Sequence, residues 1–90
     1  MTWEVQWTGA AQRALERLPE KVATACIEFV YSRLADNPYR AGKPLRFELE
    51  GIFGARRGDY RVLYTIADEE ESVTVVAVQH RADVYRVRAG

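Results

Sequence analysis

Histidine and cysteine are nearly absent from this 90-residue sequence, which has one of each, His80 and Cys26. A single cysteine excludes an intrachain disulfide. Because Cys26 lies in an apolar helical stretch, we expect a buried small hydrophobe in a reducing compartment rather than a nucleophile. The usual ligand clusters of a metal site are missing. Apolar runs also end well short of the ~20 residues that a membrane span needs. We therefore predict a cytoplasmic protein with no metal, no other cofactor and no membrane contact.

An excess of charge of one sign is also missing, since 13 basic and 13 acidic residues give a net charge of zero. A neutral chain is not typical of nucleic-acid binders. The distribution is uneven, however, and the local field decides where a polyanion docks. The alternative is that these arginines are ordinary solvated surface side chains with no binding role. Basic residues gather between positions 40 and 61 and in the tail: Arg40, Lys43, Arg46, Arg56, Arg57, Arg61, Arg81, Arg86 and Arg88.

The first third of the chain predicts a strand followed by two helices. Residues 3–7 alternate apolar and polar with period two, as a half-buried strand does. Thr8 can cap the next segment, whose apolar positions have helical spacing. Pro19 suits the first turn of a second helix, which is expected to end before Asn37-Pro38. The apolar face of that helix comprises Val22, Ala23, Cys26, Ile27, Phe29, Val30 and Leu34.

The rest of the chain predicts extended segments separated by turns. Residues 39–44 are expected to form a polar loop, and residues 45–50 alternate as a strand or strand-like edge does. Residues 52–57 and 60–66 flank Gly58-Asp59, which predicts a β-hairpin with a type II′ turn. After an acidic turn, the β-branched run 73–78 is typical of a strand buried on both faces.

The order of these elements predicts one α+β domain spanning residues 1–90. An N-terminal strand and a two-helix hairpin precede an antiparallel sheet of three to four strands. The economical arrangement places the helix hairpin on one face of that sheet.

The register of the two hairpins predicts a basic cluster. A two-residue loop at Gly58-Asp59 pairs Arg56 with Arg61, and directly opposed residues share a face. That face is expected to be the open one, because the other set of side chains is more apolar. If the next loop has an even number of residues, Arg61 opposes Val78 and His80 joins the arginine face; an odd loop or a bulge would reverse this.

Two directly opposed arginines repel each other, so the pair makes physical sense with an anion between them. The alternative is a structural network in which acidic residues neutralise both. His80 is the side chain best able to exchange a proton near neutral pH, although a solitary histidine is more often structural.

Two stretches of the chain carry a resemblance to the RelE/ParE toxin superfamily. Residues 54–64, Gly-Ala-Arg-Arg-Gly-Asp-Tyr-Arg-Val-Leu-Tyr, are similar to its core signature, and residues 80–86 to its C-terminal His-Arg-x-x-x-Tyr motif. Pro38 and residues 42–45 resemble its helix-to-sheet loop. The likeness covers nearly the whole chain and is greatest to RelE-type toxins of actinobacteria. It implies a RelE-like, microbial-ribonuclease-like fold.

The resemblance also implies an activity and a partner. RelE-type toxins are metal-independent mRNA endonucleases that cut codons in the ribosomal A site and so inhibit translation. A RelB-like antitoxin holds them inactive, with a heterotetramer among the expected complexes. Arg61 would stabilise charge on the scissile phosphate, Arg56 and Arg81 would bind phosphate, and His80 or Tyr85 would move a proton. The residues expected to grip RNA or the ribosome are Lys43, Arg46, Arg57 and Arg86.

One departure from the family leaves alternatives open. The best-studied RelE branch has lysines on the strand before the hairpin, where this chain has Ile52 and Gly54, so the general base is unassigned. A ParE-type inhibitor of DNA gyrase would share the fold. So would a degenerate toxin that only binds its antitoxin.

Overall fold

The computed structural model describes residues 2–45 and 51–80. Four of the predicted site residues, Arg46, Arg81, Tyr85 and Arg86, lie outside the described residues. The elements are β1 (Glu4–Trp7), α1 (Gly9–Glu16), α2 (Glu20–Phe29), the π-helical turn η1 (Val30–Leu34), α3 (Pro38–Ala41), β2 (Lys43–Pro44), β3 (Phe53–Arg57), β4 (Tyr60–Ala67) and β5 (Ser72–His80).

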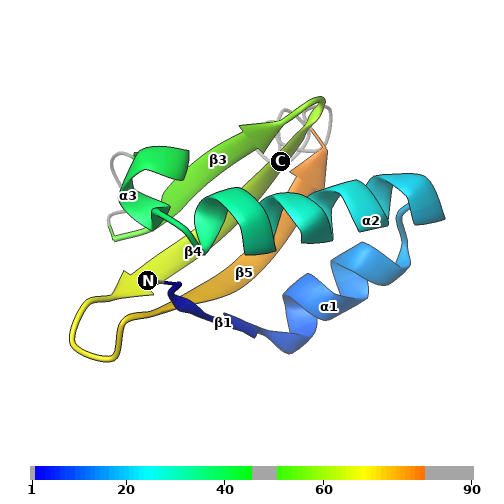
Figure 1. Ribbon diagram of the computed structural model, residues 1–90. Coiled ribbons are helices and arrows are strands. Elements are labelled where there is room, and N and C mark those ends of the chain that lie inside the picture. The colour runs from blue at the N-terminus through cyan, green and yellow to red at the C-terminus, as the bar shows by residue number, and fades with distance from the viewer. Residues whose placement is uncertain (1, 46–50, 81–90) are drawn as a thin grey trace.

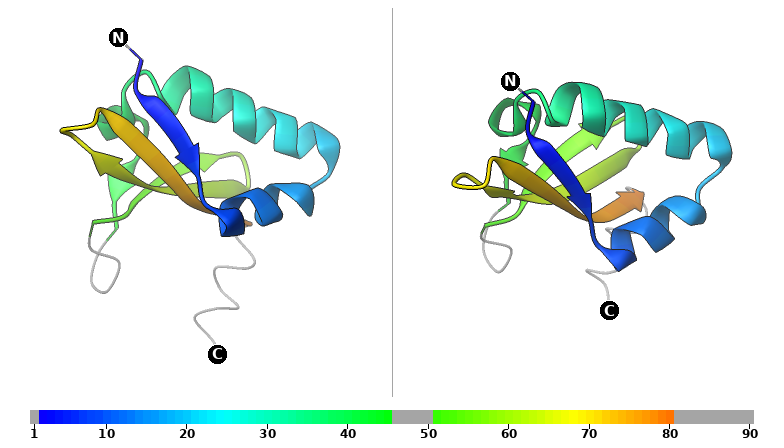
Figure 2. Two further views of the ribbon diagram at one scale, coloured as in Figure 1. Left: turned by 90° about the horizontal axis from the view of Figure 1, so that it is seen from below. Right: turned by 60° about the horizontal axis from the view of Figure 1, so that its bottom comes forward.

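The five described strands form one sheet in the order β1-β5-β4-β3-β2. β1 runs parallel to β5, and the other neighbours are antiparallel. α2 lies across one face of this sheet, and α1 packs beside β5 at its end (Figures 1 and 2). The predicted α+β arrangement with a helix pair on a sheet is confirmed. The sheet is wider than predicted because β1 joins it and β2 adds an edge.

Side chains at the helix ends explain where the helices begin. The Thr8 hydroxyl accepts a hydrogen bond from the Ala11 amide at 3.1 Å and so caps α1, as predicted. Pro19 stands at the N-cap of α2, just before the helix rather than inside its first turn. The helical chain continues through η1 and stops before Asn37, whose side chain accepts from the Arg40 amide and caps α3.

The core lies between α1, α2, η1 and the sheet. The predicted inner face of the second helix is confirmed at Cys26, Val30 and Leu34, which are buried. It is wrong at Ile27, which is 38% exposed. Trp3 and Trp7 pack against the core cluster, as the strand pattern predicted. The cluster consists of Ala11, Val30, Leu34, Ala55, Val62, Tyr64, Val73 and Val75.

The prediction of a polar loop at residues 39–44 is wrong, because this segment contains α3 and β2. Pro38 is buried, and its carbonyl oxygen accepts a hydrogen bond of 2.6 Å from the Tyr64 hydroxyl. Gly42 then permits a close approach: a Cβ there would lie 2.6 Å from both the Gly54 carbonyl oxygen and the Tyr64 hydroxyl. These contacts fix β2 against β3. Most of the predicted strand over residues 45–50 lies outside the described residues.

In the part of the chain that the structure describes, the helices are too short or too polar to cross a membrane.

Candidate nucleic-acid interface

The β3–β4 hairpin has the register that the sequence predicts. Gly58 has φ 63°, while Asp59 is not among the described non-glycine residues with positive φ, as a type II′ turn requires. Arg56 is the direct partner of Arg61, and Arg57 is the partner of Tyr60. The two motif arginines therefore lie side by side on one face of the sheet.

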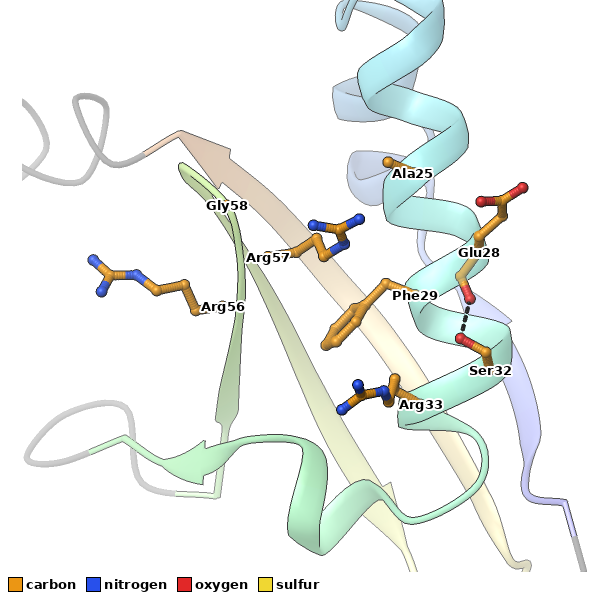
Figure 3. Close-up of a pocket in the computed structure, with 8 residues that line it drawn as sticks. All are labelled: Ala25, Glu28, Phe29, Ser32, Arg33, Arg56, Arg57 and Gly58. Carbon is orange, nitrogen blue, oxygen red and sulfur yellow. Dashed lines mark hydrogen bonds between the residues drawn. The ribbon is translucent and has the colours of Figure 1, made fainter.

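The two faces of the hairpin differ in what covers them. Ala55, Val62 and Tyr64 are buried on the side of α2. Arg56 lies on the opposite side and points away from α2, whereas Arg57 points toward it (Figure 3). We call the side of β3 and β4 that carries Arg56 and Arg61 the open face. The prediction that the arginine pair lies away from the helices is confirmed.

The open face gains a third cation from β2. Lys43 pairs with Gly54, which pairs in turn with Leu63, so all three lie in one row across the sheet. Arg56 and Arg61 form the neighbouring row. The strand β2 thus brings Lys43 to the same face as the arginine pair. The sequence did not reveal this placement, because residues 39–44 read as a loop.

Arg61 is the most enclosed cation of the open face. Its side chain is partly buried, while Arg56 and Lys43 are exposed. The Nε atom of Arg61 is buried and has no hydrogen-bond partner among the described residues. A buried N–H without a hydrogen-bond partner costs free energy, and an anion that binds the guanidinium group would offset that cost.

The predicted place of His80 is wrong. The β4–β5 loop has an even number of residues and Ile66 opposes Val73, as predicted. A β-bulge then shifts the register: Leu63 pairs with Ala77 but Tyr64 pairs with Val75, which leaves Val76 as the extra residue. Arg61 consequently opposes Gln79, not Val78.

His80 instead pairs with Tyr60, on the same side of the sheet as Val62. The two rings meet edge to face, with centroids 5.0 Å apart and planes at 77°. The structure therefore brings together Lys43, Arg56 and Arg61, and it adds Gln79 to their face. It places His80 on the other face, at the end of β5.

Arg57 lines a second site on the helix side of the hairpin. A pocket of about 430 Å³ opens between α2, η1 and the hairpin end (Figure 3). Arg57 and Arg33 point into it beside the Phe29 ring (Figure 3). Arg57 is thus separated by the sheet from the Arg56–Arg61 pair. Arg33 could not be predicted as a site residue, because nothing in the sequence marks the π-helical turn that carries it.

Cys26 lies on α2 beside this pocket and has a shifted pKa. Burial raises the pKa of the Cys26 thiol, and the positive charge of Arg57 only partly opposes this. Burial and the raised pKa favour the protonated thiol, which is a poor nucleophile.

Comparison with known proteins places these features in a family. The family described as ParE toxin of type II toxin–antitoxin system, parDE, matches residues 5–85. Toxin RelE of Mycobacterium tuberculosis is 51% identical over 85 residues, 94% of this chain and 88% of that protein. Toxin RelG of the same organism is 49% identical over 86 residues, 96% of this chain and 99% of that protein.

A solved structure agrees with the sequence relatives. It is the toxin–antitoxin complex RelBE2 from Mycobacterium tuberculosis, one chain of which superposes with a TM-score of 0.87 at 46% identity. The match covers 91% of this chain and 94% of the other. The predicted RelE-like fold is confirmed. The chain therefore belongs to the ParE toxin family and is the toxin of a type II toxin–antitoxin system.

Proposed function

We propose that this toxin is an endoribonuclease that cuts mRNA in the ribosomal A site without a metal ion. The single observation that carries the proposal is the direct pairing of Arg56 with Arg61 on the open face, next to Lys43. Three cations on one sheet face form a site of the right sign for an RNA backbone.

The electrostatics of the pair support an anionic ligand. Like charges directly opposed across two strands destabilise a sheet. The Nε atom of Arg61 is buried and lacks a hydrogen-bond partner in the part of the chain that the structure describes. A phosphate between the two guanidinium groups turns this repulsion into attraction, and guanidinium groups bind phosphate bidentately.

The chemistry assigns each cation a task. Attack by a ribose 2′-hydroxyl on the neighbouring phosphorus develops negative charge on the phosphoryl oxygens, which a preorganised cation stabilises. Arg61, the partly buried member, is suited to that role. Arg56 and Lys43 bind the flanking phosphates. Arg46, Arg81 and Arg86 extend this binding in the proposal, on the strength of the family resemblance.

Proton transfer remains with the residues named by the resemblance. The proposal assigns it to Tyr85 and His80. Because His80 lies at the end of β5 and not in the arginine rows, it would act from the end of the sheet. Replacing His80 by alanine would therefore reduce cleavage less than replacing Arg61.

A RelB-like antitoxin is the proposed partner. The solved relative from Mycobacterium tuberculosis is a toxin–antitoxin complex, RelBE2. A disordered segment of the antitoxin could bind the exposed basic face and fold as it binds. The ribosome as target places the toxin in the cytoplasm.

The test is primer extension on one mRNA in a purified translation system. Free wild-type toxin should cut within the A-site codon, and Arg61→Ala should lose at least 100-fold in rate, on the order expected for removal of a charge-stabilising group. Intact mRNA with folded wild-type toxin would reject the proposal.

A second candidate, inhibition of DNA gyrase, is favoured by one observation. The structure places His80 away from the arginine pair, which weakens the nuclease set predicted from sequence. A gyrase inhibitor would stay toxic after Arg61→Ala and would cause gyrase–DNA cleavage complexes to accumulate. Toxicity lost in that variant, without such complexes, would remove this candidate.

A further inference from the structure

Gly54 lies on the open face and has no side chain, which leaves room for a neighbouring side chain. It lies on β3 diagonally across from Arg61, two residues before Arg56. A Cβ at Gly54 would lie 3.3 Å from Cδ of Arg61. The stem of the Arg61 side chain therefore lies over Gly54, the diagonal position on β3.

We propose that Gly54 is a positioning residue for Arg61. The inference rests on the proposed nuclease function, in which Arg61 stabilises the transition state. By leaving the diagonal position empty, Gly54 gives the arginine a place to lie. It also holds Arg61 ready before substrate arrives, which is what electrostatic catalysis requires.

The neighbours of Gly54 make this position sensitive to one methyl group. The same added Cβ would meet Cδ2 of Leu45 at 3.2 Å and Cδ2 of Leu63 at 3.4 Å. Leu63 is buried and therefore has little room to yield. The Arg61 stem must then shift by several tenths of an ångström or change rotamer, which also exposes its buried Nε.

The expected effect is on catalysis rather than on binding. A displaced Arg61 stabilises the transition state less, while Arg56 and Lys43 still hold the RNA. Gly54→Ala should therefore lower the single-turnover cleavage rate by about 10-fold, less than the ~100-fold cost of a full 1 Å misplacement, with the ribosome affinity unchanged. Gly9→Ala in α1 is the matched control, because its Cβ would meet only the mobile guanidinium of Arg13.

A second readout does not depend on activity. In the free toxin, the Nε–H of Arg61 should exchange slowly with solvent, since the atom is buried. NMR of wild type and Gly54→Ala should show this exchange accelerated at least several-fold in the variant and unchanged in Gly9→Ala. The double variant Gly54→Ala/Arg61→Ala should cleave no more slowly than Arg61→Ala alone, because a residue that acts through another adds nothing once the other is gone.

The outcomes separate this inference from the nuclease proposal. An unchanged Arg61 Nε–H in Gly54→Ala overturns the positioning role, and so does unchanged cleavage. A wild type that does not cleave overturns the nuclease proposal, whereas the NMR result still shows whether Gly54 holds Arg61. If Gly54→Ala fails to fold, Gly54→Ala/Leu45→Ala removes the shortest contact, keeps the methyl group against Arg61 and must show the same loss of rate.

Discussion

Arg56 and Arg57 are neighbours in sequence and face opposite sides of the sheet. Arg56 belongs to the open face with Arg61, while Arg57 points toward α2 (Figure 3). Both are exposed arginines on the same short strand. They differ chiefly in the direction of the side chain, so each is a control for the other.

Arg56→Ala is expected to weaken RNA binding on the ribosome and to reduce cleavage by about tenfold. This is the loss expected when one charge-assisted contact to a phosphate is removed. Arg57→Ala should change both by less than a factor of about three on the same scale. Binding to programmed ribosomes and single-turnover cleavage measure the two effects. Equal losses in both variants would contradict the assignment of the open face.

Tyr64 is the other residue whose surroundings give a measurable signature. It is buried, its hydroxyl donates to the Pro38 carbonyl oxygen, and burial raises its pKa to about 12. A tyrosine in an unfolded chain has a pKa near 10. Between these values the unfolded state loses the proton and the folded state keeps it, so the folded state loses stability as pH rises.

We therefore expect the free energy of unfolding to fall by ~2–3 kcal/mol from this group between pH 10 and 12. Tyr64→Phe should be less stable than wild type at pH 7 by about 1–2 kcal/mol, because the Pro38 carbonyl loses its donor. Because wild type loses ~2–3 kcal/mol and Tyr64→Phe loses none from this group, the gap should close above pH 10 and reverse in favour of Tyr64→Phe near pH 12. Urea unfolding at several pH values checks this, and a constant gap would show that the Tyr64 hydroxyl does not set the slope.

At the scale of elements, the edge strand β2 depends on the close approach of two glycine backbones. A methyl group at Gly42 would lie 2.6 Å from the carbonyl oxygen of Gly54, and backbone cannot yield as a flexible side chain does. Gly42→Ala should therefore displace β2 and destabilise the fold by about 2 kcal/mol, the usual cost of forcing a carbon into filled space. Chemical denaturation, with Gly9→Ala as the glycine-to-alanine control, measures this. Equal stability of the two variants would contradict the packing described for α3 and β2.

The two hairpins differ in how well the sequence predicts their register. The first hairpin was predictable in register because Gly58-Asp59 marks a tight turn and the flanking strands alternate on one face. The predicted register of the second hairpin failed at Val76, which lies in the run 73–78, where apolar residues occupy both faces. Without alternation, nothing in the sequence shows that one residue is extra, and one extra residue moves every later side chain to the other face.

The short elements around residues 38–44 were missed for a different reason. Proline and glycine in a polar stretch indicate a loop, and propensity alone cannot foresee tertiary contacts. Asn37 caps α3, the Tyr64 hydroxyl holds Pro38, and Gly42 admits β2 to the sheet. Two of these three contacts involve partners more than ten residues away. The position of Lys43 on the open face follows from them.

At the scale of the whole molecule, charge distribution matters more than net charge. The chain is neutral, yet Lys43, Arg56 and Arg61 share one face, while the acidic turn after β4 lies at the other end of the β3–β4 strand pair (Figure 1). Such an arrangement orients a protein in the field of a polyanion. Under the proposed function, the described cations of the open face bind phosphate, and the reactive geometry of the RNA comes from outside the toxin. The ribosome, which holds a codon in a fixed path, would supply that geometry.

One comparison can test whether cleavage of mRNA depends on the ribosome. One mRNA is incubated with free toxin in three forms: naked, on ribosomes with a vacant A site, and on ribosomes with the A site filled by tRNA. We expect a cut in the A-site codon only with the vacant site, and at least 100-fold slower cutting with Arg61→Ala. Equal cutting of naked mRNA, or intact mRNA on vacant ribosomes with folded wild-type toxin, would contradict it.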